Sequence, residues 1–155
     1  MTPPVPKTGR SAKERVPRII KPSAPASDFF EGNVSDVIRI MRRGMSAQVV
    51  PDVAARLGIS QDKLFERLRL PKSTMKSRIG NKQPLSATEQ DRMYRADRVW
   101  NRALAVLEDE NAARSWITRD NRSLGGESPL ALLDTEAGYE LVLDTLGRIE
   151  YGVVA

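Results

Sequence analysis

The chain has 155 residues and a formal net charge of +5, and its length suits one ordinary domain or two small domains that share a core. The absence of cysteine and histidine excludes disulfides, thiolate chemistry and cysteine-based zinc sites, and removes the commonest general base and metal ligand. No apolar run approaches membrane-spanning length and no signal peptide is recognisable, so we expect a cytoplasmic protein without a membrane partner, metal or cofactor.

The first segment, residues 1–32, holds six of the ten prolines and scattered basic residues, with little periodic apolar content. Such a composition cannot bury enough surface to offset the entropy lost on ordering. We predict a disordered, basic, proline-rich tail. Its basic groups either remain solvated, which is the simpler interpretation, or contact DNA phosphates.

From residue 33 the apolar residues recur at helical spacing. A short stripe over residues 37–41 stops at Gly44. A second stripe over residues 49–57 ends at Gly58, which we predict to be the C-cap because glycine adopts the left-handed conformation without steric cost.

Ser60 is predicted to cap the following helix, which ends before Pro71 because the residue preceding a proline avoids the helical region. A short helix over residues 72–79 is then expected to bury Met75 and Ile79. These elements predict a compact helical domain.

The pattern at Ser86 and Glu89 fits a capping box and begins the longest predicted helix, which extends to about Leu107. A helix over residues 110–118 follows. No segment alternates with the period of two that a strand requires, so we predict an all-α fold.

After a loop at residues 121–126, a helical turn is expected over residues 128–133 and a last helix over residues 135–150. Gly138 lies inside that last helix, where glycine lowers helix stability by roughly 1 kcal/mol relative to alanine. We therefore expect another element to approach the helix closely at this position.

The charge is divided along the chain. Residues 35–102 hold fifteen basic and seven acidic groups, whereas residues 103–155 hold four basic and ten acidic groups. A basic segment suits a polyanion such as DNA, because phosphate contacts supply much of the affinity. The chain is interpreted as a nucleic-acid-binding half followed by a protein-binding half.

Residues 47–79 have the order of a helix-turn-helix, in which a short helix packs on one side and offers polar groups to DNA on the other. Arginine and lysine read guanine edges, and serine and threonine add phosphate contacts. The predicted DNA-binding residues are Arg67, Arg69, Lys72, Ser73, Thr74, Lys76, Ser77 and Arg78.

Two groups of motifs resemble one known family. Residues 70–78 (LPKSTMKSR) and 84–89 (PLSATE) resemble the Xre-like helix-turn-helix domain of the Xre/MbcA/ParS antitoxins. Residues 124–138 (LGGESPLALLDTEAG) and 148–152 (RIEYG) resemble the C-terminal toxin-binding domain of the same antitoxins. The domain organisation implied is a tail over 1–32, a helix-turn-helix domain over 33–99 and a toxin-binding domain over 100–155.

The resemblance implies a homodimeric antitoxin that binds a RES-domain toxin, an enzyme that consumes NAD⁺, obstructs its active site, and represses its own operon by binding operator DNA. The chain end is short and apolar, and we hypothesise that it enters the toxin's active-site cleft. The predicted toxin-binding residues are Arg148, Tyr151, Gly152, Val153, Val154 and Ala155.

Three alternatives remain. A free-standing repressor would use the C-terminal domain only to dimerise. An enzyme would have to rely on carboxylates such as Asp109 or Asp134, which instead lie at predicted helix starts where they complement the helix dipole. An RNA-binding protein is disfavoured by the scarcity of aromatic residues for base stacking.

Overall fold

A computed structural model of the chain describes residues 33–152. Regular structure in this range is helical, apart from one isolated β-bridge between Ser46 and Pro84, and the predicted all-α class is confirmed. The elements are α2 (Val34–Arg43), α3 (Val49–Leu57), α4 (Gln61–Arg67), α5 (Lys72–Gly80), α6 (Ala87–Leu107), α7 (Glu110–Thr118), the 3-10 helices η1 (Arg122–Leu124) and η2 (Leu130–Asp134), and α8 (Glu136–Glu150).

The helix ends coincide with residues that satisfy free backbone groups. Ser60 Oγ accepts the backbone N–H of Lys63 at 3.1 Å. In the capping box, the Glu89 N–H donates to Ser86 Oγ at 3.3 Å, and the Ser86 N–H donates to Glu89 Oε2 at 2.8 Å. Gly58 ends α3 with a left-handed φ of 67°. These caps confirm the predicted boundaries.

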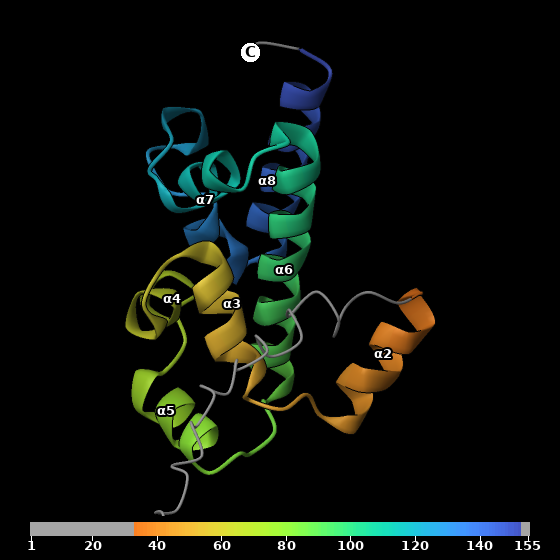
Figure 1. Cartoon of the computed structure of the whole chain (residues 1–155), viewed down its shortest axis with the longest axis vertical. Helices are drawn as coiled ribbons and strands as arrows, with labels where there is room; N and C mark the ends of the chain where they lie inside the picture. Colours follow the sequence, from red (N-terminus) through yellow and green to blue (C-terminus); the bar gives the residue numbers. More distant parts are fainter. Residues whose placement is uncertain (1–32, 153–155) are drawn as a thin grey trace, which may run out of the picture.

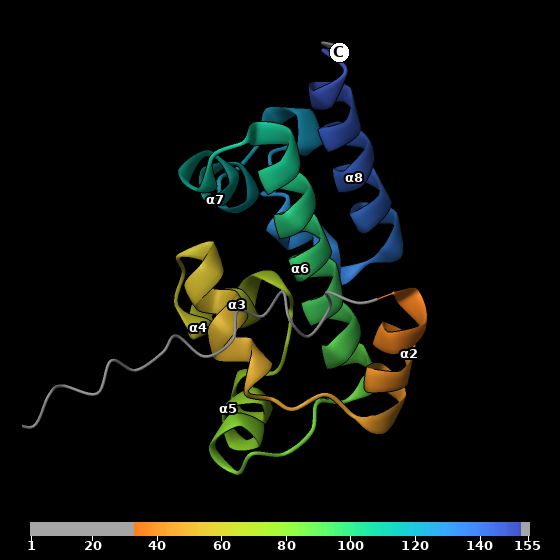
Figure 2. The same cartoon turned by 45° about the vertical axis from the view of Figure 1, so that its right-hand side comes forward.

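The 21-residue helix α6 is the axis of the molecule. In Figures 1 and 2, α8 runs along one side of α6 and α3 packs against another, with α4 and α5 beyond α3 and with α2 on the opposite side of α6. The predicted division between residues 99 and 100 falls within α6. Both predicted domains therefore share this helix, and the division itself stays a prediction.

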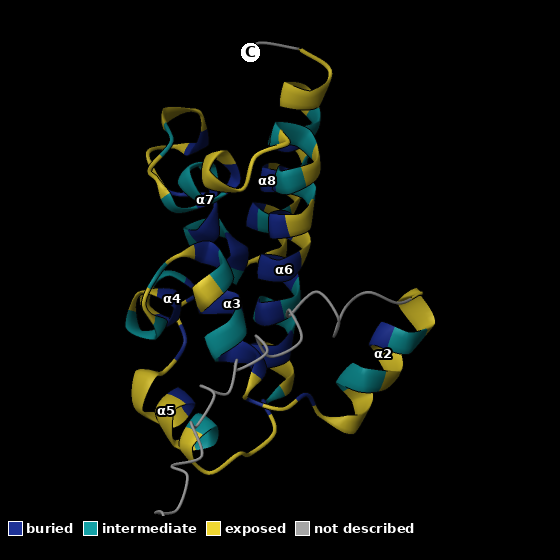
Figure 3. Ribbon diagram, in the orientation of Figure 1, coloured by how far each residue is buried: buried dark blue, intermediate teal, exposed yellow. Residues whose placement is uncertain are grey.

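One hydrophobic core joins the two halves of the described chain. Figure 3 shows its buried residues where the helices face one another around α6. Phe65 and Met75 contribute from the first half, and Ile117 and Leu146 from the second. The predicted burial of Met75 is confirmed, whereas Ile79 is partly buried against the core.

Gly138 makes the close approach that the sequence predicts. A Cβ at this position would overlap the backbone carbonyl oxygen of Leu132 and would lie 2.8 Å from the carbonyl carbon. The neighbour is thus the 3-10 helix η2, which replaces the helical turn expected over residues 128–133. This contact sets how α8 leaves η2 and runs along α6.

The predicted tail at residues 1–32 lies outside the described residues, as do residues 153–155. None of the helices between residues 33 and 152 has the length and apolar character needed to cross a membrane. Within the same range, no group of three or more acidic residues is placed to hold a metal ion.

Candidate nucleic-acid and protein interfaces

The helix α5 presents a polar face on the outside of the molecule. Met75 is fully buried and fixes the opposite side of α5 in the core. The exposed side chains are Lys72, Ser73, Thr74, Lys76 and Ser77. Six of the eight predicted DNA-binding residues thus lie on α5, and five of the six are on its exposed face. Their role in binding DNA stays a prediction.

The two lysines of α5 converge on one carboxylate. Lys72 Nζ lies 2.8 Å from Asp62 Oδ2, and Lys76 Nζ lies 3.1 Å from Asp62 Oδ1. Hydrogen bonds from both lysines lower the pKa of the Asp62 carboxyl below its ordinary value of 3.8. The carboxylate is therefore ionised at neutral pH and offsets part of the positive charge of the helix.

Arg78 faces α6. Its Nε lies 3.0 Å from Oε2 of Glu89, and its Nη1 donates to the carbonyl oxygen of Pro84 at 3.4 Å. The same buried Glu89 accepts the backbone N–H of Ser86 in the capping box. Arg78 therefore ties the end of α5 to the start of α6.

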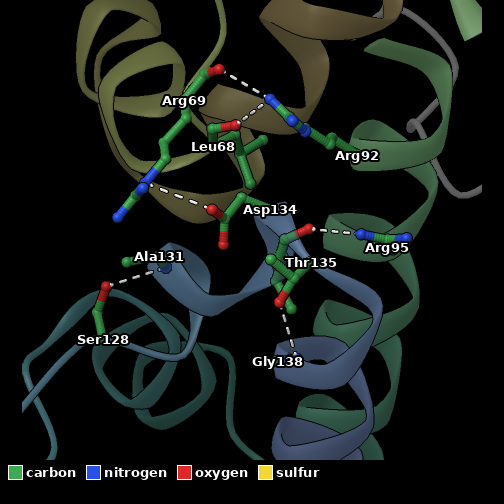
Figure 4. A network of polar contacts seen from close by, with 10 residues as sticks. Leu68, Arg69, Arg92, Arg95, Ser128, Ala131, Asp134, Thr135 and Gly138 are labelled. Atoms are coloured by element: carbon green, nitrogen blue, oxygen red, sulfur yellow. Dashed lines mark hydrogen bonds and ion pairs between the residues drawn. The ribbon is translucent and has the colours of Figure 1, made fainter. Parts of the chain in front are cut away.

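Arg67 and Arg69 precede α5 in the chain and pair with acidic residues of the second half of the chain. Arg67 Nη1 lies 3.6 Å from Asp120 Oδ1, and Arg69 Nε lies 3.4 Å from Asp134 Oδ2 (Figure 4). Arg92 of α6 donates to the carbonyl oxygen of Arg69 at 2.7 Å. These contacts join the turn before α5 to α6 and η2.

The second candidate surface is the carboxyl end of α8, which Figure 1 shows at one extreme of the molecule. Tyr151 is 80% exposed, and Arg148 and Gly152 are also exposed. Arg102 pairs with Glu150 through both of its terminal nitrogens and holds the pKa of the Glu150 carboxyl below its ordinary value of 4.5. The last turn of α8 is thus attached to α6, while Tyr151 and Gly152 beyond it are exposed.

Two family models match the chain in succession. Residues 36–96 match the antitoxin Xre-like helix-turn-helix domain. Residues 102–152 match the antitoxin Xre/MbcA/ParS C-terminal toxin-binding domain. The chain belongs to the Xre antitoxin family.

Curated relatives of this antitoxin carry antitoxin names. It is 26% identical to "Prs ADP-ribosylating antitoxin" of Sphingobium sp. over 82% of the chain and 86% of the relative. It is 32% identical to "Antitoxin Xre" of Pseudomonas putida over 54% of the chain and 52% of the relative. It is 37% identical to "Antitoxin Xre" of Photorhabdus laumondii over 50% of the chain and 53% of the relative. The matches to the last two span about half the length of those relatives.

Because these relatives are antitoxins, which are not enzymes, the prediction that the chain is not an enzyme is confirmed. The acidic residues named under the enzyme alternative have structural partners in the antitoxin. Asp109 caps α7 by accepting the backbone N–H of Ala112 at 2.7 Å. Asp134 pairs with Arg69, as described above.

Sequence reasoning missed the central role of Arg95 in the antitoxin. Its Nη2 lies 2.8 Å from Oδ2 of Asp91 and 2.9 Å from Oε2 of Glu136, and its Nη1 donates to the carbonyl oxygen of Leu133 at 3.1 Å. The guanidinium also lies 5.8 Å from the ring centre of Tyr139. Of these partners, Asp91 lies four residues from Arg95, at the spacing that helix periodicity pairs, whereas Glu136 and Leu133 are distant in the sequence.

Two exposed features were also missed. Gln83 lines a surface hollow with Ser73, Thr74, Ser77 and Arg78, although it lies in the loop after α5. On α8, Leu141 and Ile149 are each 41% exposed, so the exposed surface of this helix is partly apolar. Gln83 could have been found from the sequence, because its side chain can form hydrogen bonds and it follows closely after the helix predicted to bind DNA.

Proposed function

We propose that this antitoxin neutralises a RES-domain toxin that consumes NAD⁺, by binding it through residues 100–155 and covering its active site. The observation that carries the proposal is the match of residues 102–152 to a toxin-binding domain. The name of the Sphingobium relative refers to ADP-ribosylation. An ADP-ribosyl group is supplied by NAD⁺, so the name supports a toxin that uses NAD⁺.

The chain end is the proposed contact with the toxin's cleft. Tyr151 and Gly152 project from the last turn of α8, and Arg148 is exposed on the same turn. The segment Val153, Val154 and Ala155 is small and apolar. A cleft that receives an anionic dinucleotide would accommodate such an end, and the acidic second half of the chain would complement a basic surface around it.

Deletion of residues 151–155 tests this contact. We expect the truncated antitoxin to keep its helical content and melting temperature, because Glu150 still pairs with Arg102, but to protect poorly against the toxin. The measurement is NAD⁺ consumption by purified toxin titrated with either form. Full protection by the truncated form would refute the role of the chain end.

We further propose that the antitoxin represses its own operon as a homodimer, with α5 in the major groove of the operator. The exposed lysines and hydroxyl groups of α5 and the match of residues 36–96 to a helix-turn-helix domain support this proposal. Two copies would place two α5 helices on the two halves of a symmetric operator. Repression of a bacterial operon would also place the protein in the cytoplasm.

The experiment is co-expression with the product of the neighbouring gene, followed by a pull-down and an NAD⁺ assay. Co-purification together with suppressed NAD⁺ consumption is the expected result. A chain that binds operator DNA but captures no companion would support the free-standing repressor instead. Lys76→Ala is the matched control, since it should weaken operator binding by about 1–3 kcal/mol if Lys76 reads a base, while leaving toxin capture intact.

A further inference from the structure

Two lysines of α5, the candidate DNA-recognition helix, direct their ammonium groups at the carboxylate of Asp62. Asp62 belongs to the first turn of α4, whereas Lys72 and Lys76 lie four residues apart on α5 and therefore on one face of it. Each lysine contacts a different oxygen, at 2.8 Å and 3.1 Å. The side chains remain 47–57% exposed, so the three groups meet at the surface.

Asp62 is not needed to build either helix. The N-cap of α4 is Ser60, whose hydroxyl accepts the backbone N–H of Lys63. The helix α5 is held by the buried Met75 and by the pairing of Arg78 with Glu89. Exposed ion pairs contribute little to stability. The main effect of Asp62 is therefore electrostatic.

A DNA phosphate offers the lysines the same chemistry as this carboxylate, namely two anionic oxygens on one centre. Each ammonium group keeps free N–H donors beside its contact with Asp62, but the carboxylate neutralises part of the positive charge of the two lysines and repels a second anion. A phosphate therefore binds Lys72 and Lys76 more weakly while Asp62 is paired with them. Phosphate contacts carry no direct sequence information. The competition therefore acts on duplexes of every sequence.

We propose that Asp62 is an intramolecular competitor of the DNA backbone that limits the affinity of α5 for DNA of any sequence. The inference rests on the proposed DNA-binding function. Asp62 would chiefly weaken binding to non-operator DNA, because phosphate contacts supply nearly all of the affinity there. A larger share of the antitoxin then stays off the bulk of the chromosome.

The test compares Asp62→Asn with Glu66→Gln. Glu66 lies on the same helix and lines the same surface hollow as Asp62 and Lys72, but it forms no ion pair with another described residue. Both substitutions remove one negative charge and so raise the net charge of the protein by one. Only Asp62→Asn frees the two lysines.

Binding is measured by fluorescence anisotropy on a duplex from upstream of the gene and on an unrelated duplex of equal length, over a range of salt concentrations. For Asp62→Asn we expect affinity for both duplexes to rise roughly three- to tenfold, with a steeper salt dependence. Glu66→Gln should change affinity less than about twofold at 0.15 M salt, where charges are screened over about 8 Å. The gain should disappear when Lys72 and Lys76 are both replaced by alanine.

Measurable but equal binding of the wild type and Asp62→Asn would overturn this inference and leave the DNA-binding proposal standing. An equal gain from Glu66→Gln, or a gain that survives without the two lysines, would also overturn it. Binding of neither form to any duplex, by a protein that still captures its toxin, would overturn both. Unchanged circular dichroism and melting temperature verify that each variant is folded.

Discussion

At Gly138 the absence of a side chain decides the path of the backbone. The amide N–H of Gly138 donates to the cap residue Thr135 at 3.0 Å, and the backbone of Leu132 lies against the Gly138 Cα. An added methyl group would meet main-chain atoms of η2, which cannot rotate away as a side chain does. Gly147 lies in the same helix with open space around it.

Substitutions at these two glycines should therefore act in opposite directions. We expect Gly138→Ala to lower the free energy of unfolding by about 1–3 kcal/mol or more, because η2 or α8 must shift. Gly147→Ala should raise it by roughly 0.5–1 kcal/mol, because alanine favours the helix. Urea unfolding followed by circular dichroism measures both. A stabilising Gly138→Ala would contradict the close contact.

At the scale of the helices, α5 depends on the capping box of its neighbour α6. Glu89 is buried, accepts the Ser86 N–H at 2.8 Å and faces Arg78 Nε at 3.0 Å. One carboxylate therefore both caps α6 and anchors α5. Losing the serine removes half of the box, whereas losing the glutamate also leaves the guanidinium of Arg78 without its partner.

We expect Ser86→Ala to lower the free energy of unfolding by about 0.5–2 kcal/mol, as for other N-caps. Glu89→Ala should cost roughly 1–3 kcal/mol more, because it removes a charged acceptor from a site that is mostly shielded from water. Urea titrations of the two variants give the comparison. Equal losses of unfolding free energy in the two variants would show that the Arg78–Glu89 pair does not stabilise the fold.

The helix boundaries could be predicted because their causes are local. Ser60, Gly58 and the box at Ser86 each act within a few residues. The partners of Arg69 and Arg78 could not, because Asp134 is far along the chain and Glu89 lies across a loop. Both arginines were predicted to bind DNA because of their charge. Only the structure shows which acidic groups they pair with.

At the scale of the whole molecule, the division of charge does not coincide with a division of the core. The basic first half and the acidic second half share α6, and Arg69–Asp134 and Arg67–Asp120 join them at the surface. Arg95 ties α6 to both η2 and α8. The sequence motifs separate two functions, whereas the buried residues form one cluster.

A shared core predicts that the two halves unfold together. Both tryptophans, Trp100 and Trp116, lie in the second half, so their fluorescence reports on that half, whereas circular dichroism at 222 nm reports on all the helices. We expect the two urea transitions to coincide, as they do in a two-state protein. A fragment of residues 100–155 should remain unfolded, because it lacks the first thirteen residues of α6, including Met93 and Arg95, which the core and η2 require. Separate transitions, or a folded fragment, would instead establish residues 100–155 as an independent domain.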